Sequence, residues 1–122
     1  LSTDEIKEMD VAGMIIGSHG VNHNPFINLT LEESKREIEE SFSFLNDLIQ
    51  NNPVKTFCYP HGLPHTFRNT DIKFLESNQV DFSFAVESKD LTNSDILENP
   101  HSLPRYDCNE FNHGSAFNPK RR

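Results

Sequence analysis

Two histidines, His19 and His23, are spaced so that both imidazoles can reach one metal ion. Side chains at this spacing come together when the intervening backbone makes a single helical turn. The pair directly follows the apolar residues 14–17 and Ser18, and this run predicts a short buried strand. Because α/β folds build their sites at the carboxyl ends of strands, the placement favours a metal site over the alternative, two exposed loop histidines.

Two further clusters of polar residues follow strand-like segments. Residues 59–62, with the sequence Tyr-Pro-His-Gly, end a predicted strand at 54–59. Residues 103–107, Leu-Pro-Arg-Tyr-Asp, come after a Phe-rich predicted strand at 82–86. Parallel strands bring their carboxyl ends to one face of a fold, so we expect the three polar clusters to converge.

Helices are predicted between these strands. Capping boxes at residues 2–5 and 30–33 open two helices that end near residues 13 and 50. Asn69 or Thr70 is predicted to cap a third helix. The alternation of helix and strand indicates an α/β fold with parallel strands and crossover helices. The second helix carries an apolar inner stripe at helical spacing: Leu31, Ile38, Phe42, Leu45 and Ile49.

The composition limits the classes of protein and partner. A chain of 14.0 kDa is one domain at most, which we expect to span residues 1–108 and to be followed by an irregular tail at 109–122. The net charge of −8 disfavours nucleic acid as a partner. No apolar run approaches the roughly 20 residues that span a bilayer. With only Cys58 and Cys108, a disulfide framework is not indicated.

In combination, these motifs resemble the polysaccharide deacetylase family (NodB-homology domains, carbohydrate esterase family 4). The resemblance extends from Leu1 to about Asp107 and includes residues 13–23, 57–62 and 103–105. It implies a partial (β/α) barrel and a metal-dependent hydrolase that removes N-acetyl groups from a saccharide. The implied cofactor is a divalent metal, most often Zn, with Co, Ni or Mn as alternatives. The Tyr-Pro-x-Gly form with Arg is also similar to relatives linked to cell-surface polysaccharide assembly.

The resemblance assigns roles to single residues of this sequence. His19 and His23 match the two metal-binding histidines of the family. His61 falls where the family usually has an aromatic residue whose backbone N–H helps to hold the oxyanion, a role that any residue with an N–H can keep. Exposed aromatic side chains beside polar groups suit sugar binding, so the substrate-binding candidates are Tyr59, with the adjoining Pro60, and Tyr106. The alternative for both tyrosines is packing in the core or at the rim.

Two positions depart from the family pattern. Cys58 stands where many members have an Arg that pairs with the catalytic carboxylate, and Arg105 stands where many have a His that acts as general acid. Arginine cannot donate a proton near neutral pH. Our hypothesis is that Arg105 supplies the missing cation, with a surface residue as the alternative. The acid role would then fall to His101, His65 or the His61 side chain, each of which can instead be an exposed loop histidine.

The family's Asp-Asp motif, which supplies the general base and the third metal ligand, does not occur in this sequence. Four aspartates look like surface charges or helix caps instead: Asp4, Asp10, Asp71 and Asp81. The motif would precede Leu1, and the non-Met start favours a truncated portion of a catalytic domain. The alternatives are a non-catalytic carbohydrate-binding or glycan-assembly module, or a structural metal site in a small α/β protein.

Overall fold

The fold is built on short parallel strands, and the computed structural model describes residues 1–111. Strands β1 (Thr56–Cys58) and β2 (Phe82–Phe84) pair in parallel, with Phe57 opposite Ser83. Single parallel bridges join Ser18 to Phe57 and Phe84 to Leu103. Four chain segments therefore lie side by side in sequence order, with helices crossing between them. This confirms the predicted α/β class with parallel strands.

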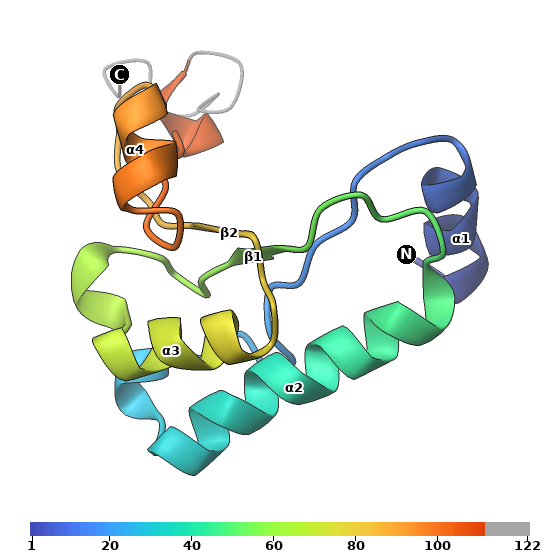
Figure 1. The fold of residues 1–122 in the computed structure, drawn as a ribbon, viewed down its shortest axis with the longest axis horizontal. Coiled ribbons are helices and arrows are strands. Elements are labelled where there is room, and N and C mark those ends of the chain that lie inside the picture. Colours follow the sequence, from blue (N-terminus) through green and yellow to red (C-terminus); the bar gives the residue numbers. More distant parts are fainter. Residues whose placement is uncertain (112–122) are drawn as a thin grey trace.

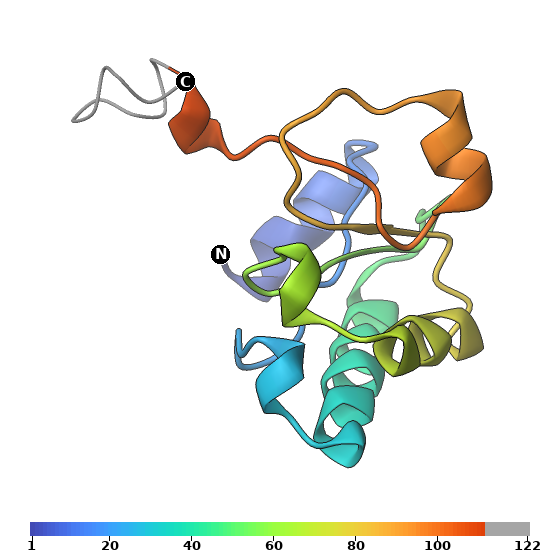
Figure 2. The same ribbon diagram turned by 90° about the vertical axis from the view of Figure 1, so that its left-hand side faces the viewer.

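Helices cover both sides of the strands (Figures 1 and 2). The longest helix, α2 (Leu31–Leu48), lies beside α3 (Asn69–Ser77), and α4 (Asn93–Glu98) lies on the opposite side of the strands. Helix α1 (Thr3–Val11) precedes the first strand segment. Both predicted capping boxes are present, at the starts of α1 and α2. Short 3-10 turns occupy Phe26–Asn28, Pro64–Thr66 and Cys108–Glu110.

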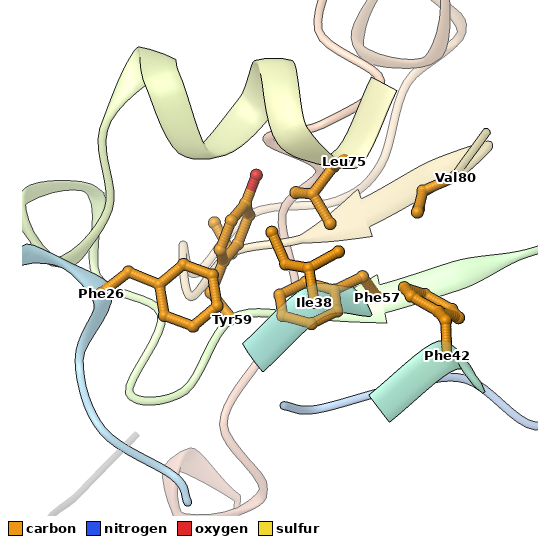
Figure 3. Close-up of a cluster of buried hydrophobic side chains, with 8 residues drawn as sticks. Phe26, Ile38, Phe42, Phe57, Tyr59, Leu75 and Val80 are labelled. Atoms are coloured by element: carbon orange, nitrogen blue, oxygen red, sulfur yellow. The ribbon is translucent and has the colours of Figure 1, made fainter. Parts of the chain in front are cut away.

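The core lies between α2, α3 and β1 (Figure 3). Ile38 and Phe42 of α2 pack with Leu75 of α3 against Phe57 and the residues that follow β1. Four of the five residues in the predicted stripe of α2 are buried, and the exception is Leu31, which is 47% exposed. Leu31 is the first residue of the helix, whose first turn contributes nothing to the core cluster.

The predicted buried strand at residues 14–17 is wrong. Met14 and Ile15 are 57% and 55% exposed, and only the following residue, Ser18, forms a bridge to a neighbouring strand. A fully buried strand needs partners on both edges and both faces. Within the described part of the chain, this segment has a strand neighbour on one edge alone, so its apolar side chains remain exposed.

Two of the four aspartates expected to be surface charges or helix caps are buried, and of these two Asp71 is a cap, whereas Asp10 is not. Asp71 is fully buried and accepts hydrogen bonds from the Arg68 backbone N–H and side chain in the first turn of α3. The Arg68 guanidinium also donates to the carbonyl oxygens of Phe26 and Leu29. Asp10 is 3% exposed and accepts from the backbone N–H of Gln50. Arg68 therefore joins α3 to the segment that leads into α2.

No helix among residues 1–111 has both the length and the apolarity needed to cross a membrane. Of the predicted irregular tail, Asn109 and Glu110 belong to the last 3-10 turn. Residues 112–122 lie outside the described residues.

Candidate functional site

Three histidines face one another across a cleft at the carboxyl ends of the strand segments. The ring centroids of His19 and His23 are 4.8 Å apart, and those of His23 and His61 are 4.9 Å apart. His19 directly follows the bridge at Ser18, and His61 follows β1. The predicted convergence of the first two polar clusters is therefore present in the structure.

The ring of His19 is held by the neighbouring strand. Its Nδ1 lies 2.6 Å from the carbonyl oxygen of Cys58, which can only accept, so Nδ1 carries the proton. The other ring nitrogen, Nε2, is then the one with a free lone pair. A carbonyl on the remote nitrogen is the usual way in which proteins orient a histidine that binds metal.

The loop that joins the two histidines is fixed from helix α2. The Ser18 hydroxyl donates to the Ser41 hydroxyl at 2.6 Å and accepts from the Gly20 N–H at 3.1 Å. Further along the loop, Glu37 accepts from the backbone N–H groups of Val21 and Asn22. Sequence reasoning did not single out Glu37. The sequence signal for Glu37 is that it is a charged residue on a helix face that otherwise carries apolar and small side chains.

The turn after β1 depends on backbone conformations that few residues adopt. His61 and Gly62 have φ values of 66° and 80°, and His23 in the opposite loop has a φ of 58°. A Cβ at Gly62 would lie 2.9 Å from the Val86 side chain and 3.3 Å from an Arg105 nitrogen. Only glycine fits there, so the turn brings the backbone close to the Arg105 guanidinium.

Arg105 comes from the third polar cluster and lies against Cys58. Burial raises the pKa of the Cys58 thiol, and the charge of Arg105 and a hydrogen bond from it lower that pKa in part. The Nε of Arg105 is buried without a hydrogen-bond partner. The structure thus places this cation beside position 58, in the region where our hypothesis requires it.

The cleft has a volume of about 640 Å³ and carries both signs of charge. Asp107 and Glu110 line it together with the three histidines and Arg105. Glu110 is tied in place because it accepts from the Ser88 hydroxyl and from the backbone N–H of Asp107. These two carboxylates were not among the site residues that we expected from the sequence.

The three predicted substrate-binding residues lie away from this cleft. Tyr59 is 1% exposed, its ring stacks on Phe67 at 3.8 Å, and its hydroxyl donates to the His101 carbonyl. Pro60 is also fully buried. Tyr59 therefore packs in the core, which was the alternative to a sugar-binding role. Tyr106 is 42% exposed but donates to Asp90 and does not line the cleft.

The three histidines considered for the acid role are separated by the structure. His101 is 8% exposed, and its Nδ1 lies 2.9 Å from the Ser83 hydroxyl in a different pocket. Burial lowers the pKa of His101, which favours a neutral ring. His65 is exposed in the 3-10 turn Pro64–Thr66. Of the three, His61 is the one that lines the cleft.

The geometry of the His19–His23 pair is suitable for two ligands of one metal ion. Two imidazoles bound to one ion at the usual Zn–N distance have ring centres roughly 5 Å apart, close to the observed 4.8 Å. Imidazole nitrogens suit Zn and Ni, among other transition metals. Within residues 1–111, however, no three His, Cys, Asp or Glu side chains are arranged to hold an ion. The pair therefore lacks a third ligand in the part of the chain that is described.

Comparison with known proteins agrees with this geometry. The sequence profile of the family described as "Polysaccharide deacetylase" matches residues 2–84, which is more than half of the chain. The chain belongs to this family. No curated protein sequence matches the chain.

A solved structure shares the fold of this family member. It is the Streptococcus pyogenes deacetylase PplD in complex with acetate, with a TM-score of 0.74 and 20% sequence identity. The match covers 87% of this chain and 44% of the streptococcal chain. The parallel segments and crossover helices described above are thus part of a deacetylase-type fold, and the chain spans less than half the length of the protein that it matches.

Proposed function

We propose that this chain is part of a metal-dependent hydrolase that removes N-acetyl groups from a saccharide. The observation that carries the proposal is the His19–His23 pair, with ring centroids 4.8 Å apart at a polar cleft, in a member of the polysaccharide deacetylase family. A substrate in solution can reach the cleft, because His19, His23 and His61 are all exposed.

In this proposal His19 and His23 hold a divalent ion, with zinc as the first candidate and Co, Ni or Mn as alternatives. His19 binds through Nε2, because Nδ1 is occupied by the Cys58 carbonyl. The ion supplies the Lewis acidity that activates a water molecule and polarises the amide carbonyl. Its affinity in this chain alone is low, since two protein ligands are fewer than the three of a usual catalytic zinc site.

His61 and Arg105 serve the same reaction from the neighbouring strand ends. The His61 backbone N–H helps to hold the oxyanion of the tetrahedral intermediate. The His61 ring, which lines the cleft beside His23, is the candidate that remains for protonating the leaving sugar amine. Arg105 orients a carboxylate through its unpartnered Nε, because a guanidinium within a few ångströms favours the ionised form.

The general base and the third metal ligand are placed by this proposal outside residues 1–122. Two findings support that placement: the sequence has no Asp-Asp pair, and the chain spans 44% of the streptococcal deacetylase that it resembles. The lack of a third metal ligand among residues 1–111 also agrees with a second candidate, a non-catalytic carbohydrate-binding module that retains the deacetylase fold.

Acetate release separates the two candidates. We would assay the natural polypeptide that contains this chain on N-acetylglucosamine oligomers, with and without added Zn²⁺ or Co²⁺. The hydrolase predicts metal-dependent release that His23→Ala abolishes and that His65→Ala, a change at an exposed loop histidine, leaves intact. Oligomer binding without acetate release under any metal would instead establish the binding module.

A further inference from the structure

We infer that Glu37 is a positioning residue that sets the conformation of the loop between His19 and His23. The inference rests on the proposed metal-dependent function, because the loop carries both proposed ligands. Glu37 Oε1 accepts from the Val21 N–H at 3.3 Å and from the Asn22 N–H at 3.0 Å, and Oε2 accepts from the Asn22 side-chain amide at 3.0 Å.

The surroundings of Glu37 are unusual for a helix residue. The side chain is on α2 and is 6% exposed, yet it forms no ion pair with a Lys or Arg of residues 1–111. Burying a carboxylate without a cation is costly unless several N–H groups compensate. Here, every hydrogen bond that the structure gives to the carboxylate comes from the loop. Holding that loop is thus the role that the contacts of Glu37 support.

Helix α2 holds the loop at two points on its buried face. Ser41, one helical turn after Glu37, accepts from the Ser18 hydroxyl just before His19, and Glu37 binds the stretch before His23. The loop passes close to the carboxylate at Gly20, where a Cβ would lie 3.4 Å from Glu37 Oε1. The two attachments bracket the turn between the histidines.

The loop needs such support because its conformation is not intrinsically favoured. His23 has a φ of 58°, a left-handed conformation that non-glycine residues adopt only uncommonly. Strained conformations of this kind persist where the surrounding structure enforces them. Losing a residue that orients metal ligands typically lowers metal affinity by about 10–100-fold.

The test compares Glu37→Leu with Glu40→Leu in the whole chain. Leucine fills much of the volume of Glu37 but removes both acceptor oxygens, while Glu40 is an exposed glutamate on the same helix. Calorimetric titration with Zn²⁺ should show about 10–100-fold weaker binding for Glu37→Leu and no change for Glu40→Leu. The visible spectrum of bound Co²⁺ should change only in Glu37→Leu.

Amide hydrogen exchange of the metal-free protein supplies a second measurement. In Glu37→Leu the amides of Val21 and Asn22 should exchange faster, because they lose their acceptor, while those of Ile38 and Phe42 in α2 keep their protection. Unchanged zinc affinity, or exchange that accelerates equally throughout α2, would overturn the positioning role.

If the wild-type chain binds neither Zn²⁺ nor Co²⁺, the proposed function fails, and the positioning role is then decided by exchange alone. Faster exchange confined to the loop supports the positioning role, and exchange that is unchanged or uniformly faster overturns it.

Discussion

The Nδ1 atom of His19 lies 2.6 Å from the carbonyl oxygen of Cys58, so the backbone of β1 orients an imidazole on the neighbouring chain segment. The same two segments are joined by the Cys58 N–H, which donates to the Ser18 carbonyl at 2.9 Å. The orientation of the histidine is therefore coupled to strand pairing, and the free Nε2 is available to a ligand before any ligand binds.

Metal binding should depend on His19 and should be weak. His19→Ala removes one of two imidazole ligands, so Zn²⁺ affinity measured by isothermal titration should fall by at least about 10-fold. His65→Ala is the control because it removes an exposed histidine from the turn Pro64–Thr66. Equal binding by wild type and His19→Ala would remove the pair from consideration as a metal site.

The isolated chain of 122 residues should release almost no acetate from acetylated glucosamine oligomers. Without a positioned carboxylate base, proton transfer is slower by about 10²–10⁴-fold, and an incomplete ligand set adds to the loss. Fast, metal-dependent release would contradict this prediction. The carboxylate to change next would be Asp107, which lines the cleft, and loss of that activity in Asp107→Asn would identify it as the base.

Arg105 should control the reactivity of Cys58. The charge of Arg105 and its hydrogen bond lower the pKa of the thiol against the raising effect of burial, so Arg105→Gln should raise that pKa further. Alkylation by iodoacetamide at pH 8.5 should then be slower in a Cys108→Ser background, which leaves one thiol. Lys89→Gln removes an exposed cation and should have no effect. Equal alkylation rates for all variants would show that Arg105 does not contact the thiol in solution.

The local signals in the sequence were sufficient for the helices and for the arrangement of the histidines. Capping boxes at Ser2 and Thr30 fix helix starts through hydrogen bonds between residues three apart, and these form whatever the rest of the chain does. The parallel pairing of the strands was predictable from a different signal, the alternation of helical and strand-like segments along the chain. An equivalent box at Thr92 and Asp95 starts α4, which is not among the predicted helices.

Features that depend on distant neighbours could not be read from the sequence. Residues 14–17 have the composition of a buried strand, but their burial depends on partners that the described chain provides on one edge only. Tyr59 looks like an exposed aromatic beside polar residues, yet Phe67 and His101 enclose it in the core. The role of Glu37 is visible only once the loop that it binds is in place.

The ion pair of Arg68 and Asp71 should be important for stability. Asp71 is fully buried at 3.1 Å from Arg68, so Arg68→Ala leaves a buried carboxylate without its cation, although the backbone N–H of residue 68 still donates to it. Breaking such a pair typically lowers the free energy of unfolding by about 3–5 kcal/mol. Urea unfolding should show this loss, with Arg36→Ala, at an exposed position of α2, within about 0.5 kcal/mol of wild type. A loss no larger than that of the control would contradict the buried pair.

His101 should make the folded state less stable as the pH falls. Burial lowers the pKa of His101, and the negative charges of Glu76 and Asp81 offset only part of this effect. Above the unfolded-state pKa of about 6.5, the ring is neutral in both states. As the pH falls through that value toward the lower folded-state pKa, the unfolded chain binds the proton first, so the contribution of His101 to stability is lost. Unfolding free energies measured between pH 7.5 and 5.5 should decline less steeply for His101→Asn than for wild type. The control, His65→Ala, changes an exposed histidine and should decline as wild type does. Equal slopes for all three proteins would contradict burial of the neutral ring.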